Sequence, residues 1–184
     1  MATFPNRPNP ALLVVDVQHD VVKAAHARAT VIANIVRLVD QARRADVPVI
    51  WVLQTDDNLS RGSDGWKLAA PLATLTNEAV IEKTYGDAFE ETDLEAELQQ
   101  RGIGHLIVVG AQTDGCIRAT IHGAFVRGYD VTLVTDAHTT EDFTSYGAPS
   151  PDLVIAHTNL IWKYETAPGR TAAAIPTAEV TFSG

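Results

Sequence analysis

The stretch Leu106-Ile-Val-Val-Gly-Ala-Gln-Thr-Asp-Gly-Cys116-Ile-Arg-Ala-Thr120 decides the fold, and it contains the only cysteine of the chain. Its first four residues form an apolar run of the kind found in strands buried on both faces. Gly110 is expected to end that strand, and Thr113 or Asp114 to cap a following helix. Apolar residues then recur at helical spacing. The pattern therefore predicts that Cys116 lies in the first turn of a helix that follows a central strand.

That position gives Cys116 two possible roles. The unpaired N–H groups and the dipole of a helix N-terminus favour a thiolate, and they lower the pKa of a cysteine from its usual value of about 8.5. The same N–H groups can stabilise a developing oxyanion. Alternatively, Cys116 is a small buried hydrophobic side chain, as most isolated cysteines are. This stretch alone leaves both interpretations open.

Composition narrows the class of protein. The chain has 184 residues, of which 46% are hydrophobic and 20% charged, and this predicts one soluble globular domain over residues 1–184. The net charge of −9 argues against nucleic acid or an anionic membrane as a partner and suits a small-molecule substrate. A single cysteine excludes an internal disulfide. No segment resembles a signal peptide or a membrane span, so we expect a cytoplasmic protein.

Predicted strands alternate with predicted helices along the chain. The strands are expected at 11–17, 47–53, 78–83, 106–109 and 129–135, with a candidate edge strand at 178–182, and the helices at 30–45, 93–101, 115–127 and 151–164. Such alternation is typical of βαβ units. It predicts an α/β fold in which a mostly parallel sheet of about six strands has helices on both faces.

Three chemically capable side chains coincide at one edge of that sheet. Asp16 is expected where the first strand ends, Lys83 where the third ends, and Cys116 just after the fourth. Taken singly, they have structural explanations, as a loop-capping aspartate, a solvated lysine and a buried cysteine. Ligands of open parallel sheets bind beyond the carboxyl ends of the strands. The coincidence of all three at that edge therefore favours a site.

This constellation resembles the isochorismatase-like cysteine hydrolase superfamily. The resemblance is carried by Leu13-Val-Val-Asp16-Val-Gln18, by Glu82-Lys83 with Phe89 downstream, by Val109-Gly-Ala-Gln-Thr113-Asp-Gly-Cys116 with Ala119-Thr120, and by Gly128-Tyr-Asp-Val, Asp136-Ala137 and Ala156-His-Thr-Asn159. It covers nearly the whole chain in order. It implies a Rossmann-like three-layer αβα fold, hydrolase activity, and a homodimer or homotetramer.

The resemblance also implies roles for individual residues. Cys116 would be the nucleophile, Asp16 its general base and Lys83 the cation that holds both. Mutual attraction between an ammonium and two anions supports such an arrangement. A cis peptide bond would join Ala111 and Gln112, so that the backbone N–H groups of Gln112 and Cys116 form an oxyanion hole. Five further residues are expected to contact substrate, namely Gln18, Tyr85, Phe89, Thr113 and Ile117.

One departure from the family pattern concerns metal. Nicotinamidases of the superfamily carry an Asp-x-His motif after the second strand, together with another histidine. Here that region reads Gln54-Thr-Asp-Asp57, and no histidine occurs between Asp57 and Lys83. We therefore expect neither a metal ion nor another cofactor.

The leading hypothesis is a metal-independent cysteine amidohydrolase that acts on a small carboxamide, carbamoyl or related C–N substrate through a thioester. An isochorismatase-type hydrolase of vinyl ethers, with Asp16 as the acid and no need for Cys116, is the first alternative. A non-catalytic protein that binds a small molecule or senses thiol oxidation is the second. A dinucleotide-binding domain is excluded because the turn after Val109 lacks the required second glycine.

Overall fold

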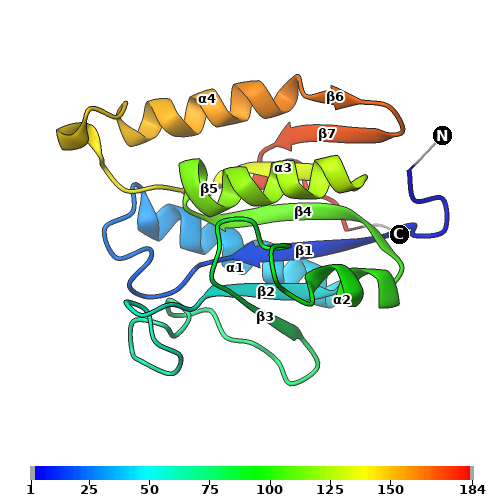
Figure 1. Cartoon of the computed structure of the whole chain (residues 1–184), viewed down its shortest axis with the longest axis horizontal. Helices are drawn as coiled ribbons and strands as arrows, with labels where there is room; N and C mark the ends of the chain where they lie inside the picture. The colour runs from blue at the N-terminus through cyan, green and yellow to red at the C-terminus, as the bar shows by residue number, and fades with distance from the viewer. Residues whose placement is uncertain (1–2, 183–184) are drawn as a thin grey trace.

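The structure, a computed structural model, describes residues 3–182 (Figure 1). Its strands are β1 (Asn9–Val15), β2 (Val49–Gln54), β3 (Ala79–Lys83), β4 (Ile103–Ala111), β5 (Asp130–Thr139), β6 (Thr166–Ala167) and β7 (Arg170–Ile175). They form one seven-stranded sheet in the order β3-β2-β1-β4-β5-β7-β6. All neighbouring strands are parallel except β6 and β7. The predicted α/β fold with a mostly parallel sheet is confirmed.

Helices cover both faces of the sheet (Figure 1). They are α1 (Arg28–Arg44), α2 (Leu94–Gln100), α3 (Arg118–Arg127) and α4 (Pro151–Lys163). Because side chains alternate along a strand, β1 contributes to two cores. Leu12 and Val14 pack in the core that includes α1, whereas Leu13 and Val15 pack in the core that includes α2 and α3. The three layers predicted from the sequence are therefore present.

The sheet changes winding direction between β1 and β4. The chain leaves β1 toward β2 through α1, and it leaves β4 toward β5 through α3 on the opposite face. Such a switch point opens a crevice at the carboxyl ends of the two strands. The strands approach closely there, because Gly110 has φ 127° and a Cβ atom on it would overlap the Val15 backbone. The switch point is where the predicted site residues converge.

Several element boundaries differ from the prediction. β4 continues through Gly110 to Ala111 instead of ending at the glycine, since pairing with β1 and β5 sustains it. The segment expected to form the edge strand at 178–182 begins within a 3₁₀ turn, Thr177–Glu179, so that prediction is wrong. The remaining strands, β6 and β7, were not predicted, because β7 is alanine-rich and shows no alternation of apolar and polar side chains.

Candidate active site

Asp16, Lys83 and Cys116 come together at the switch point. Lys83 Nζ lies 2.7 Å from Asp16 Oδ2 and 3.2 Å from Cys116 Sγ. Asp16 follows β1 and adopts φ 51°, a left-handed conformation that is uncommon outside glycine. Lys83 ends β3, two strands away, and its long side chain reaches past the end of β2. Asp16 and Lys83 are 1% and 2% exposed, so the ion pair is excluded from solvent.

The environment keeps the cysteine protonated. Burial, followed by the charge of the Asp16 carboxylate, raises the pKa of Cys116 to about 11, although the Lys83 ammonium opposes the rise. The expectation of a lowered pKa at a helix N-terminus is therefore wrong. Burial also raises the pKa of Asp16, against the attraction of Lys83. At Lys83 burial favours the neutral amine, but Asp16 and Cys116 outweigh it and raise the pKa. The resting site thus holds a thiol beside a carboxylate–ammonium pair.

One oxygen of Asp16 is available to the thiol. Asp16 Oδ2 accepts a hydrogen bond from the Lys83 ammonium, whereas Oδ1 is buried and has no N–H or O–H partner among residues 3–182. Burial raises the pKa of the Asp16 carboxyl, and hydrogen bonding from the Cys116 thiol is among the effects that lower it. A carboxylate oxygen in this position is suited to take the thiol proton.

Cys116 lies in a π-helical turn, Thr113–Ile117, which precedes α3 rather than belonging to its first turn. The backbone N–H groups of Gly115 and Ile117 both donate to the carbonyl of Gln112. Neither predicted cap residue caps the helix through its side chain. Asp114 instead accepts a 2.6 Å hydrogen bond from Thr140 Oγ1. The peptide bond between Ala111 and Gln112 is cis, in agreement with the implication of the resemblance.

Buried polar side chains connect this turn to the outer helix α4. Thr113 Oγ1 lies 2.8 Å from His138 Nδ1, and His138 Nε2 lies 2.9 Å from Asn159 Oδ1. Asn159 Nδ2 donates to the carbonyl of Thr135. Burial lowers the pKa of His138, so the imidazole is neutral. The Thr113 hydroxyl is engaged in this network, and its expected contact with substrate stays a prediction.

The other expected substrate contacts have different outcomes. Gln18 is wholly buried, and its amide is engaged by the backbone of Gln54 and of Trp66. Phe89 packs against Tyr129, and Ile117 belongs to the core beside α3. Burial and pairing hold these side chains in the scaffold, and their contact with substrate stays a prediction. Tyr85 is 48% exposed, and its role as a contact stays a prediction.

Gln54 is a site residue that was not predicted from the sequence. Its Oε1 lies 2.6 Å from Lys83 Nζ. Gln54 is the last residue of β2, which lies between β1, the strand before Asp16, and β3, the strand that ends in Lys83. Its position at a strand's carboxyl end was the available signal, the same one that identified Lys83.

The region that carries metal ligands in nicotinamidases is organised differently here. Asp56 accepts hydrogen bonds from Gln54 Nε2 and from the backbone N–H groups of Asn58 and Leu59, so its carboxylate closes a turn. Within residues 3–182, no three His, Cys, Asp or Glu side chains are grouped as metal ligands. The residues present do not fit the nicotinamidase metal motif.

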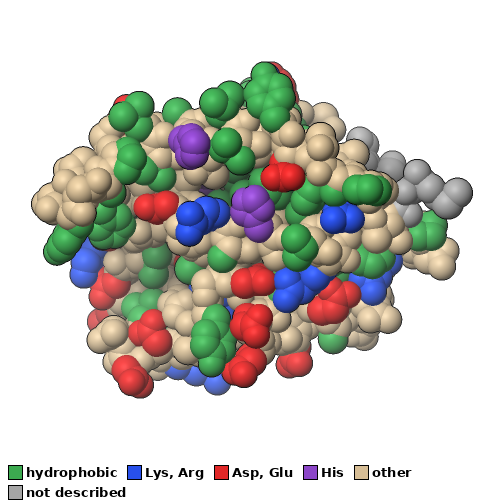
Figure 2. Space-filling view, turned by 45° about the horizontal axis from the view of Figure 1, so that its top comes forward, with side chains coloured by type: hydrophobic (Ala, Val, Ile, Leu, Met, Phe, Trp, Pro, Cys, Tyr) green, Lys and Arg blue, Asp and Glu red, His purple; other side chains and the backbone are tan. Residues whose placement is uncertain are grey.

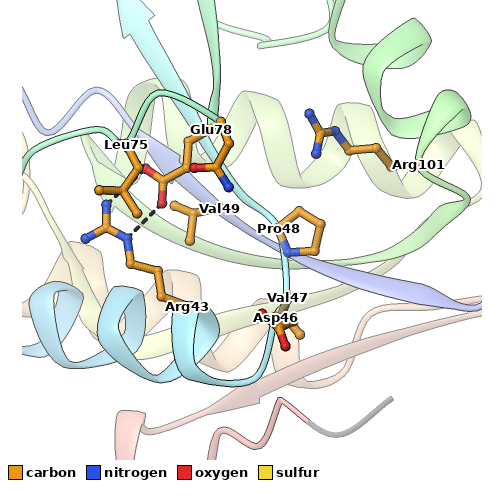
Figure 3. Close-up of a pocket in the computed structure, with 9 residues that line it drawn as sticks. Arg43, Asp46, Val47, Pro48, Val49, Leu75, Glu78 and Arg101 are labelled. Atoms are coloured by element: carbon orange, nitrogen blue, oxygen red, sulfur yellow. Dashed lines mark hydrogen bonds and ion pairs between the residues drawn. The ribbon is translucent and has the colours of Figure 1, made fainter.

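A separate pocket lies at the opposite end of β2 (Figure 3). It is lined by residues around Val49 and includes Arg43 and Arg101. Arg43 is held by both carboxylate oxygens of Glu78, and Arg101 pairs with Glu97. Because β2 starts there and ends at Gln54, this pocket is remote from the cysteine.

A cysteine, a carboxylate and an ammonium at the switch point of a doubly wound sheet define a class of α/β cysteine hydrolases. The chain belongs to the isochorismatase family, since the model described as "Isochorismatase domain" matches residues 10–148. It is a hydrolase of that family. None of the helices within residues 3–182 has the length and apolar character needed to cross a bilayer.

Individual relatives agree with this assignment. A protein of Arabidopsis thaliana named a probable inactive nicotinamidase is 32% identical, over 70% of this chain and 80% of its own. The streptothricin hydrolase of Streptomyces noursei is 37% identical over 74% of this chain, which spans only 56% of that enzyme. An isochorismatase from Pseudomonas putida KT2440 superimposes with a TM-score of 0.83 and 27% identity, covering 94% of this chain and 90% of that structure.

Proposed function

We propose that the protein is a metal-independent amidohydrolase that cleaves a small carboxamide, carbamoyl or related C–N substrate through a thioester on Cys116. The observation that carries this proposal is the buried Lys83 ammonium, which contacts both Asp16 and Cys116. A vinyl-ether hydrolase that used Asp16 alone would have no use for a thiol held in this way. The name of the related streptothricin hydrolase is consistent with hydrolysis.

The proposed reaction begins with proton transfer from the Cys116 thiol to Asp16 Oδ1 as Sγ attacks the substrate carbonyl carbon. Because the pKa of the thiol is about 11, little thiolate exists at neutral pH, and removal of the proton accompanies attack. The N–H groups of Gln112 and Cys116 would stabilise the oxyanion. Collapse of the tetrahedral species breaks the C–N bond, and the amine leaves with the proton from Asp16.

The thioester is then hydrolysed. Asp16, again ionised, takes a proton from a water molecule, whose oxygen attacks the thioester carbonyl. The C–S bond breaks, the acid product leaves, and the sulfur recovers the proton from Asp16. Lys83 stays an ammonium throughout and compensates the negative charge that moves between its two neighbours.

An ammonia-release screen over primary amides, carbamoyl compounds and ureides tests the proposal, with Cys116→Ala and Cys116→Ser as matched variants. For any substrate found, loss of the nucleophile should reduce kcat by at least about 10³-fold. Retained turnover in Cys116→Ala would instead support hydrolysis with Asp16 as the acid. Reversible oxidation of Cys116 by peroxide, without turnover of any amide, would support the sensor alternative.

We further propose that the protein assembles as a homodimer or homotetramer. Hydrophobic side chains reach the surface over α3 and α4 (Figure 2). Leu153, Leu160 and Ile161 of α4 are 59%, 55% and 48% exposed in the single chain. Light scattering at micromolar concentration should report a dimer or a larger species, and Leu160→Glu should shift it toward the monomer. A monomeric wild-type protein would contradict this proposal.

A further inference from the structure

We propose that Gln54 is a positioning residue for the active-site ammonium, holding Lys83 between Asp16 and Cys116 through a neutral acceptor. The inference rests on the proposed function, because it concerns the cation of that catalytic group. It assigns a role to a side chain whose own hydrogen bonds run to Lys83, Asp56 and Thr84.

The first argument is the number of donors on Lys83. An ammonium has three N–H groups and no acceptor. Lys83 Nζ has three partners, namely Asp16 Oδ2 at 2.7 Å, Gln54 Oε1 at 2.6 Å and Cys116 Sγ at 3.2 Å. Each N–H therefore has its own partner, and the buried ammonium needs no water. Removing the amide would leave one of these donors buried and unpaired.

The second argument is the orientation of the Gln54 amide. Its Nε2 donates to Asp56 Oδ2 at 2.9 Å and to the carbonyl of Thr84 at 3.0 Å. Both of these atoms only accept hydrogen bonds, so the NH₂ group must face them. The oxygen is thereby directed at Lys83.

The third argument is that the Gln54 backbone is fixed to the strand that carries Asp16. Gln18 Oε1 accepts from the N–H of Gln54 at 2.8 Å, and Gln18 Nε2 donates to the carbonyl of Gln54 at 2.9 Å. Gln18 lies two residues after Asp16 and is wholly buried. This pairing places the general base and the acceptor for Lys83 in one rigid frame.

The chemistry explains why an amide suits this position better than a carboxylate. A neutral amide oxygen accepts a hydrogen bond from one N–H of Lys83 and adds no negative charge beside the ammonium. A carboxylate at the same place would put a second anion against the ammonium, and the attraction that Lys83 exerts on a developing thiolate would be offset. A positioning role therefore predicts sensitivity to charge, whereas a purely structural link between β2 and the Thr84 loop predicts sensitivity only to the loss of hydrogen bonds.

The experiment measures the pH profile of Cys116 alkylation by iodoacetamide in the full chain, for Gln54→Glu and Gln54→Leu. The matched controls are Gln100→Glu and Gln100→Leu, at an exposed position on α2. In Gln54→Glu the added charge should raise the pKa of the thiol by about one unit or more, so that alkylation at pH 8 slows roughly tenfold. In Gln54→Leu the ammonium is free to shift toward Asp16, and alkylation should slow about threefold.

The controls should alkylate at the wild-type rate. Thermal unfolding distinguishes a positioning role from a purely structural one. A purely structural role would lower Tm in both Gln54 variants but leave the pH profile of alkylation unshifted in the folded protein. An unshifted profile in Gln54→Glu and Gln54→Leu would overturn the inference, as would faster alkylation. If Gln54→Glu does not fold, the profile of Gln54→Leu alone decides.

Alkylation requires no substrate, so this result is independent of the ammonia screen. A shifted profile together with a failed screen would retain the role of Gln54 and refute the proposed amidohydrolase. A successful screen with an unshifted profile would support the proposed amidohydrolase and refute the role of Gln54.

Discussion

Lys83 Nζ lies 2.7 Å from Asp16 Oδ2 although the two side chains are 0% and 2% exposed. Burying such a pair costs desolvation energy, and replacing a buried pair by apolar side chains is often neutral or stabilising. The pair is therefore a poor device for stability alone. The contact of Lys83 with the only cysteine of the chain gives the pair a chemical use. Substitutions that change the charge of either partner should therefore change the reactivity of Cys116.

Lys83→Met should leave Asp16 and any thiolate as neighbouring like charges. We expect the pKa of Cys116 to rise further, alkylation at neutral pH to slow, and the free energy of unfolding to fall by about 3–5 kcal/mol because a buried charge loses its partner. Lys83→Arg should restore alkylation only in part, since a planar guanidinium does not reproduce a compact ammonium. Lys67→Met, at an exposed surface pair, is the control. An unshifted profile in Lys83→Met would remove Lys83 from the mechanism.

Asp16→Asn should change alkylation in the opposite direction. The Asp16 carboxylate raises the pKa of Cys116, so its removal should lower that pKa below about 11 and speed alkylation at pH 8 roughly tenfold. Turnover should nevertheless fall by about 10²–10⁴-fold, because an amide cannot take the thiol proton. Asparagine also tolerates the left-handed φ of 51° at this position, so the backbone is preserved. Slower alkylation would show that Asp16 does not act on Cys116 through its charge.

Chelation should leave the enzyme active. The Asp56 carboxylate is occupied by an amide and two backbone N–H groups, and the histidines of the nicotinamidase motif are lacking. For a substrate from the ammonia screen, kcat/KM should be unchanged after dialysis against EDTA. Activity that is lost on dialysis and restored by zinc or manganese would contradict the metal-independent proposal.

Acid should destabilise the fold through His138. Burial lowers the pKa of this imidazole in the folded protein, so below the unfolded value of about 6.5 the unfolded chain binds more protons. The contribution of His138 is fully present above that pH and is lost as the pH falls toward the folded pKa. Urea unfolding at pH 7.5 and 5.5 should show a loss of roughly 1 kcal/mol that His138→Gln reduces.

The control for this prediction is His122→Gln, since His122 is an exposed residue of α3. Burial also lowers the pKa of His105, which is half-buried, so His138→Gln should remove only part of the pH dependence. A pH dependence identical in wild type and His138→Gln would contradict the prediction.

Much of the fold was predictable because it depends on local patterns. Apolar runs such as 106–109 and helical periodicity in 30–45 report burial directly, and their alternation predicts a parallel sheet with helices on both faces. Errors occurred where neighbours across the sheet override local preference. Gly110 continues β4 because β1 and β5 pair with that segment, and β7 forms beside β5 without any alternation of its own.

The sequence by itself determined that Asp16, Lys83 and Cys116 would meet, because parallel strands carry their carboxyl ends to one edge of the sheet. Only the tertiary structure decided their protonation and their partners. The thiol of Cys116 is held neutral by burial against Asp16, and the third N–H of Lys83 is satisfied by Gln54. Desolvation and charge act through space between segments far apart along the chain, and no spacing of residues encodes them.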